Sequence, residues 1–136
     1  HAVDVGAGQL AWSLRTDPRV VVHEHLNARH LRFEDVGEPA GLITCDVSFI
    51  SVTLILPAAV PLLQSGGQMV ILIKPQFEAG RGQVGKGGIV REPELHEAAC
   101  RRVEDAARAL GFETGIMESP ILGAEGNKEF LLYAHH

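Results

Sequence analysis

The feature that most constrains the fold is a regular alternation between short β-rich runs and stretches with helical patterning. Six runs are predicted to be strands: residues 2–5, 20–24, 42–46, 69–74, 114–118 and 130–134. Several of them are continuously apolar, as strands covered on both faces are. Residues 93–111 predict a helix, with a proline suited to its first turn and a glycine suited to the position after its end. This alternation predicts an α/β domain with a largely parallel sheet and crossover helices.

The size and charge of the chain narrow the function classes. Its 136 residues suit one domain, so residues 1–136 are assigned to a single unit. The formal net charge of −5 gives no general attraction for nucleic acid, and such binding would need a local basic patch. Cys45 and Cys100 form neither a disulfide framework nor a metal-ligand spacing, which favours the reducing cytoplasm and predicts no metal site. The longest apolar stretch, residues 52–63, is too short to cross a membrane.

Charged residues close four of the predicted strands: Asp4, Glu24, Asp46 and Lys74. In open α/β sheets, ligands bind beyond the carboxyl ends of the strands. A single residue of this kind is most often an ordinary strand-end charge, but four together favour a site. Asp46 and Lys74 end neighbouring strands, so we expect them within a few ångströms of one another. That pair is either a structural ion pair or a lysine placed to take a proton from a hydroxyl.

The stretch GAGQLA after the first predicted strand has two functional interpretations. Gly6, Gly8 and Ala11 have the spacing of a dinucleotide-binding loop, with Glu24 as its ribose-binding acid. In the second interpretation Asp4 is the ribose-binding acid, and the true glycine loop lies upstream and is missing. Glycines at a tight strand-to-helix turn are the purely structural alternative. This short motif alone does not decide among the three.

Residues 75–92 form a long glycine-rich stretch of the kind that is usually functional or mobile. Part of it nearly matches a phosphate-binding P-loop, but Gly87 stands where a magnesium-binding serine or threonine is needed, and no helix follows at once. The cations Arg81, Lys86 and Arg91 predict a local patch that binds a nucleic-acid backbone. A solvated loop without a ligand fits the sequence equally well.

Six stretches carry a family resemblance: VDVGAGQLAWSLRTDPRVVV, NAR, DVSFIS, LILPA, IKPQFEAGRGQVGKGGIVREPELH and SPILGAEGNKEFLLY. Together they resemble the haemolysin-A (TlyA) family of FtsJ-like, S-adenosylmethionine-dependent ribosomal RNA 2′-O-methyltransferases. The resemblance covers essentially the whole chain in order, and DVSFIS and KPQFEAG are its most specific parts. It implies a Rossmann-like sheet, S-adenosylmethionine as cofactor, ribosomal RNA or ribosomal subunits as partner, a cytoplasmic location and no membrane association.

The resemblance also implies that the opening glycines are a look-alike. In this family VDVG-GQLAW belongs to the second strand, and the cofactor's glycine loop, the central first strand and an S4-like RNA-binding segment lie upstream. The implied strand order is 20–24, 2–5, a vacant position, 42–46, 69–74, 130–134 and 114–118. The strand at 130–134 is expected to run antiparallel to its neighbours. We expect the strand edges beside the vacant position to be exposed and to invite self-association.

Catalytic roles follow from the resemblance where positions match. The FtsJ-like class uses a Lys-Asp-Lys-Glu tetrad, and Asp46, Lys74 and Glu129 match its last three members. Lys74 would help to remove the proton of a ribose 2′-hydroxyl, and Asp46 and Glu129 would orient and polarise that hydroxyl. No residue of this chain matches the first lysine.

Cofactor-binding roles are implied in the same way. Asp4 matches the acid that holds the cofactor ribose, and Asn27 and Ala28 match the segment beside the adenine; Asp46 completes the set. Two other classes of function stay open. One is a nucleotide-dependent oxidoreductase that uses Gly6 and Gly8, which a ligand over Gly6 and Glu24 would favour. The other is a non-catalytic module that contacts RNA or a partner protein.

Overall fold

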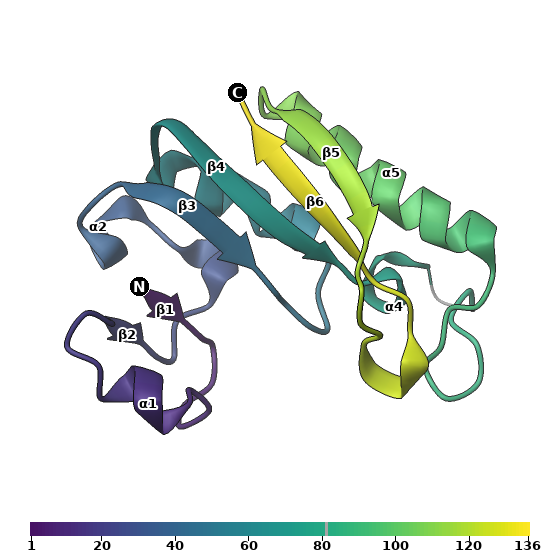
Figure 1. Cartoon of the computed structure of the whole chain (residues 1–136), viewed down its shortest axis with the longest axis horizontal. Helices are drawn as coiled ribbons and strands as arrows, with labels where there is room; N and C mark the ends of the chain where they lie inside the picture. Colours follow the sequence, from purple (N-terminus) through teal and green to yellow (C-terminus); the bar gives the residue numbers. More distant parts are fainter. Residues whose placement is uncertain (81) are drawn as a thin grey trace.

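The computed structural model describes residues 1–80 and 82–136, and it has an α/β fold (Figure 1). The strands are β1 (Ala2–Val3), β2 (Val22–His23), β3 (Ala40–Cys45), β4 (Leu63–Ile73), β5 (Glu113–Glu118) and β6 (Phe130–His135). The α-helices are α1 (Trp12–Arg15), α2 (Phe33–Val36), α3 (Leu56–Ala59), α4 (Pro75–Glu78) and α5 (Pro93–Ala109). None of these helices is both long and apolar enough to span a membrane.

The strands form two sheets whose order matches the prediction. β1 pairs with β2 in parallel, and a second sheet has the order β3-β4-β6-β5. β3 and β4 are parallel, whereas β6 runs antiparallel to both β4 and β5. The predicted Rossmann-like order and the antiparallel direction of β6 are therefore confirmed.

The two sheets are separated where the vacant position was predicted. Among the described residues, β1 pairs only with β2 and β3 pairs only with β4, so each presents an edge without a strand partner. A cavity of about 250 Å³ lies between these edges, and Val3, Leu42 and Ile43 contribute to its largely apolar lining. The Leu42 side chain is 56% exposed there. Direct pairing of β1 with β3 would have supported the dinucleotide interpretation, and the described residues do not pair in that way.

Strand bounds differ from the prediction most in β1, β2 and β4. β1 and β2 hold two residues each, because their ladder consists of the pairs Ala2–Val22 and Val3–His23 alone. β4 starts at Leu63 rather than Met69, since Leu63 pairs with Ala40 across a register irregularity in β3. The glycines between these positions resemble a turn in the sequence, and only pairing with β3 makes the segment a strand.

The long helix α5 confirms the predicted helix and builds the core. Pro93 lies in its first turn, and Gly111, just past its end, has a φ of +97°. Its buried residues Ala99, Val103 and Ala107 belong to one apolar cluster with buried side chains of β4 and β6. In Figure 1, α5 and the shorter helix α3 lie behind the sheet. This helical layer packs against β4 and β6. The site described below lies where β4 ends and β6 begins.

The opposite face of the sheet, which faces the viewer in Figure 1, is covered by no helix in the described residues. Register places five apolar side chains together on this face: Val70, Leu72, Leu131, Tyr133 and Met117. Tyr133 is 40% exposed and Met117 is 57% exposed. Because sheets of this class are normally covered on both faces, this surface is a second place where association with further polypeptide would bury apolar area.

Candidate active site

Asp46 and Lys74 meet at the carboxyl ends of two neighbouring parallel strands. Asp46 follows β3 directly, and Lys74 follows β4 at the N-cap of α4. The Lys74 Nζ lies 2.6 Å from the Asp46 Oδ1 and also donates to the Ser48 Oγ at 3.1 Å. The Lys74 side chain is 15% exposed, whereas that of Asp46 is 68% exposed. The predicted pair is therefore in contact, with a shielded cation and a carboxylate open to solvent.

Glu129 lies at the end of the strand beside β4. Ile73 pairs with Phe130, so Lys74 leaves β4 next to the point where Glu129 enters β6. The Glu129 residue is buried, at 7% exposure, and its Oε2 accepts a hydrogen bond from the Gln76 Nε2 at 3.2 Å. The structure thus brings Asp46 and Lys74 into contact and ties Glu129, the residue before β6, to Gln76 of α4.

Gly123 lies directly against the Glu129 carboxylate. A Cβ atom added to Gly123 would lie 2.0 Å from the Glu129 Oε2, a distance that no side chain can occupy without displacing this carboxylate. The loop that precedes β6 therefore needs glycine here for close approach and not for an unusual backbone angle.

Replacing Gly123 by alanine should lower the free energy of unfolding by about 1–3 kcal/mol, the usual cost of overpacking. The matched control is Gly115→Ala, because a Cβ atom there meets nothing within 4 Å. Urea denaturation of both variants measures the difference. Equal midpoints for the two variants would show that Glu129 is not confined by Gly123.

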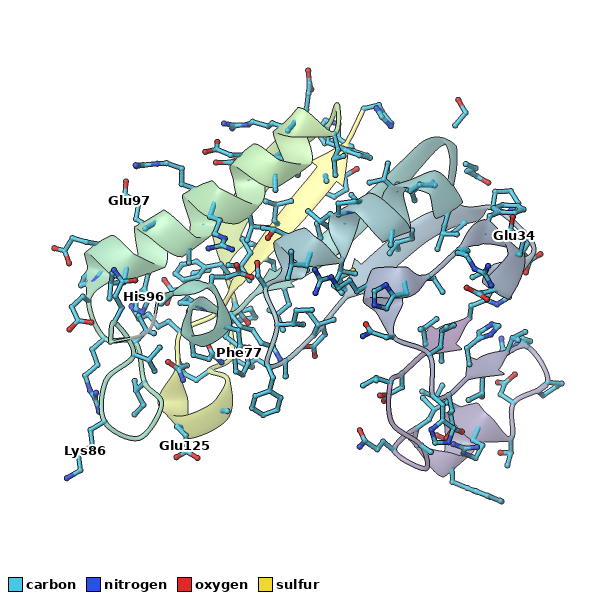
Figure 2. The ribbon with its side chains drawn as sticks, turned by 180° about the vertical axis from the view of Figure 1, so that it is seen from behind. Glu34, Phe77, Lys86, His96, Glu97 and Glu125 are labelled. Atoms are coloured by element: carbon cyan, nitrogen blue, oxygen red, sulfur yellow. The ribbon has the colours of Figure 1, made fainter. Side chains whose placement is uncertain are left out.

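Phe49 is a feature of the site that the sequence prediction missed. It lies in the segment of residues 46–51, here called the site loop, which connects β3 to the turn at η2 (Val52–Leu54). Phe49 is 90% exposed and has a φ of +64°, in the left-handed region that phenylalanine rarely adopts. Its ring centroid is 5.1 Å from that of Phe77 on α4, a residue labelled in Figure 2. The only hint in the sequence is an aromatic residue between small and polar ones shortly after a strand-end acid.

A cleft of about 480 Å³ joins the site loop to the end of β1. All four residues predicted to bind a cofactor line it: Asp4, Asn27, Ala28 and Asp46. Ser48 and Phe49 line the same cleft, so it opens directly beside Lys74. The Asn27 Oδ1 accepts from the Arg29 backbone N–H and so fixes the short turn η1 (Ala28–His30) at the cleft wall. A ligand in this cleft would reach from the first sheet to the Asp46–Lys74 pair.

The N–H groups of both glycines in the opening loop already have partners within the protein. The Gly6 N–H donates to the Asp4 Oδ1 and the Gly8 N–H donates to the Glu24 Oε2, both at 2.8 Å. Glu24 also pairs with Arg15, and these two partners hold the pKa of Glu24 below its usual value. A dinucleotide phosphate needs free N–H groups at this loop, and it would meet two carboxylates instead. The geometry therefore argues against the oxidoreductase interpretation.

The predicted basic loop is held at its stem and open at its tip. The Asn127 side chain accepts from the Val90 N–H at 3.0 Å and donates to the Gly88 carbonyl at 2.9 Å. Figure 2 shows Lys86 at the end of this loop, pointing away from the rest of the protein. The Arg91 guanidinium makes a long contact of 3.5 Å with the Lys86 carbonyl, and Arg81 lies outside the described residues. Two of the three predicted cations are thus available on one anchored loop.

The remaining reactive groups suggest no other chemistry. Burial raises the pKa of the Cys45 thiol to about 11, and burial with nearby carboxylates also raises that of Cys100 to about 11. Both thiols are therefore protonated at neutral pH and are poor nucleophiles. Within residues 1–80 and 82–136, no three His, Cys, Asp or Glu side chains gather as metal ligands would.

Comparisons with known proteins agree with this geometry. The FtsJ-like methyltransferase family matches residues 1–136. The "16S/23S rRNA (cytidine-2′-O)-methyltransferase TlyA" of Mycobacterium tuberculosis is 48% identical over 133 residues, which cover 97% of this chain and 50% of the relative. "Hemolysin A" of Brachyspira hyodysenteriae is 44% identical over 135 residues, which cover 98% of this chain and 56% of the relative.

A solved structure from Lactococcus lactis has a TM-score of 0.94 and 46% sequence identity to this chain. The match covers 98% of this chain and 65% of the solved one. The chain spans about half the length of the curated relatives it matches.

Proposed function

The chain belongs to the FtsJ-like methyltransferase family, and from this membership we propose that it carries the catalytic residues of a ribosomal RNA 2′-O-methyltransferase. The enzyme would transfer the methyl group of S-adenosylmethionine to a ribose 2′-hydroxyl. The observation that carries this proposal is the Lys74–Asp46 contact of 2.6 Å beside the cleft that Asp4 and Asn27 also line. A lysine that can serve as the base after it loses its proton and a candidate cofactor cleft therefore adjoin one another, as methyl transfer to a hydroxyl requires.

The residues of the cleft fit one half of S-adenosylmethionine. Asp4 uses only its Oδ1 for the Gly6 N–H, which leaves its Oδ2 for the hydroxyls of a ribose. The short turn at Asn27 and Ala28 offers a polar backbone edge for an adenine, while apolar side chains such as Leu26 and Ile55 line the same cleft. When bound, the cofactor supplies an electrophilic methyl group on a sulfonium.

We assign the proton transfer to the three residues at the strand ends. Lys74, once its ammonium group has released a proton to solvent, takes the proton of the 2′-hydroxyl, and its contact with Asp46 holds the Nζ at a fixed place. Glu129, fixed by Gln76, would accept the hydrogen bond of the bound hydroxyl and so orient it, and that same proton would then pass to Lys74 as the methyl group is transferred. Holding the reacting atoms in line removes much of the entropic barrier of a two-molecule reaction.

We also propose that the anchored loop and Phe49 contact the RNA. Lys86 and Arg91 extend from the anchored loop and would neutralise backbone phosphates, and Arg81 remains the third candidate. The exposed Phe49 ring offers a flat apolar face on which an unstacked base can lie. An enzyme with this substrate would work in the cytoplasm, on ribosomal RNA or ribosomal subunits.

We further propose that the chain functions joined to polypeptide that fills the open position between β1 and β3. That segment would supply the central strand, the cofactor's glycine loop and the first lysine of the tetrad. Without it, the free edges of β1 and β3 would favour self-association.

The test uses the full-length protein that carries this chain, ribosomal subunits and S-adenosylmethionine with a tritiated methyl group. We expect tritium in ribosomal RNA at a nucleotide whose 3′ linkage resists alkaline hydrolysis, because a 2′-O-methyl group removes the attacking oxygen. Tritium on a base would contradict 2′-O transfer. RNA binding without any transfer would instead favour the non-catalytic module.

A further inference from the structure

Glu78 is a buried carboxylate to which neither the family match nor the site chemistry above gives a role. It is the last residue of α4, the helix that begins directly after Lys74, and its side chain is 2% exposed. Its Oε1 accepts from the Val52 N–H at 2.9 Å, and its Oε2 accepts from the Ser51 hydroxyl at 2.6 Å. Arg102 of α5, a half-exposed side chain, lies 3.5 Å from the same Oε2. Burying a charged carboxylate lowers the stability of the fold unless hydrogen bonds and ion pairs compensate for the lost hydration. The burial of Glu78 therefore suggests a specific role for it.

The partners of Glu78 all concern the site loop. Lys74 holds the front of this loop through Asp46 and Ser48, and Glu78 holds its far end through Ser51 and Val52. Both ties come from one short segment of four helical residues and the lysine before it. The loop is therefore fixed to α4 at both ends, with Phe49 between them.

Phe49 explains why two ties are needed. A non-glycine residue with a φ of +64° is strained and keeps that conformation only where the surroundings impose it. The Phe49 side chain contributes little to this, because it is 90% exposed and touches Phe77 at one ring face. The hydrogen bonds at the two ends of the loop can instead hold the Phe49 backbone in this conformation.

We propose that Glu78 is a positioning residue for methyl transfer: it holds the site loop, and through it Phe49 and Ser48, in the arrangement that receives the RNA nucleotide beside Lys74. The proposal rests on the proposed function for its activity, but its structural half does not. Glu78 touches no reacting atom. Its removal should loosen the loop and misplace the target nucleotide while leaving the sheet intact.

The experiment compares Glu78→Leu, Glu78→Gln and the control Glu97→Ala, a solvent-facing carboxylate of α5 labelled in Figure 2. Leucine fills the volume of the buried side chain but leaves the Val52 N–H and the Ser51 hydroxyl without this acceptor, so thermal unfolding of each variant first establishes that it is folded. Glutamine keeps an acceptor for the Val52 N–H and can donate to the Ser51 oxygen. We measure amide hydrogen exchange of residues 46–52, then kcat and KM for ribosomal subunits, in the full-length protein.

We expect faster exchange confined to the site loop in Glu78→Leu, with β4 and β6 protected as in the wild type. We also expect kcat to fall about 10–100-fold, the scale of a misplacement near 1 Å, with recovery in Glu78→Gln. Unchanged exchange at residues 46–52, or unchanged kcat with a loosened loop, overturns the proposal. A wild-type protein that transfers no methyl group refutes the proposed function instead, and the exchange data then still decide whether Glu78 holds the loop.

Discussion

Replacing Lys74 by alanine in the full-length protein should reduce kcat for methyl transfer by roughly 10²–10⁴-fold, the usual contribution of a general base. The reason is local. The Lys74 Nζ is the cation that contacts Asp46, and its side chain is only 15% exposed, so a water molecule cannot simply replace a positioned amine. The affinity for S-adenosylmethionine should change little, because the cleft residues Asp4, Asn27 and Ala28 remain. Single-turnover transfer and equilibrium cofactor binding, measured separately, check the two halves of this expectation.

Lys74→Arg is the informative control for this variant. Arginine keeps a positive charge near Asp46 but stays protonated in proteins and cannot accept the hydroxyl proton. A base role predicts that Lys74→Arg is almost as slow as Lys74→Ala. If the arginine variant is as fast as the wild type, Lys74 acts only as an electrostatic partner. Near-normal transfer by Lys74→Ala would remove it from the catalytic set altogether.

The parts of this site that were predictable from the sequence lie at strand ends. A strand ending in a charged residue puts that residue at the sheet's carboxyl edge whatever the rest of the fold does, and Asp46 and Lys74 follow β3 and β4 in this way. The helix α5 was predictable for a similar reason, because its proline, glycine and i,i+4 charge pairs are local.

The parts that were not predictable depend on contacts between distant segments. Glutamate is usually a surface residue, so the sequence gives no sign that Glu78 is buried. The fold brings its carboxylate against Ser51 and Val52, which precede it by 27 and 26 residues. The left-handed backbone conformation of Phe49 could not be predicted, because glycine and asparagine are the residues that usually mark such a position in a sequence. The length of β4 likewise depends on its pairing with Ala40, which no pattern within the strand records.

The last prediction concerns the 136 residues by themselves: we expect them to bind S-adenosylmethionine weakly or not at all. The cleft offers groups for the ribose and adenine end of the cofactor, but the Gly6 and Gly8 N–H groups are already used by Asp4 and Glu24. The charged amino-acid end of the cofactor then cannot use these two donors. Hydrogen bonds to a charged group contribute roughly 1.5–3 kcal/mol each, so two absent bonds weaken binding by about 10²–10⁴-fold.

The open strand edges should also change the oligomeric state of the isolated chain in solution. Among the described residues β1 and β3 each have one edge without a strand partner, and Tyr133 and Met117 are exposed on a sheet face that no described helix covers. We therefore expect the isolated chain to elute as a mixture larger than a monomer. Titration calorimetry and size-exclusion chromatography with light scattering test both expectations on one sample. The full-length protein is the positive control, and its Asp4→Asn variant should lose affinity if Asp4 holds the ribose. Micromolar binding by a monodisperse monomer of the 136-residue chain would show instead that the Gly6–Gly8 loop is itself the cofactor loop, and that the position between β1 and β3 needs no further strand.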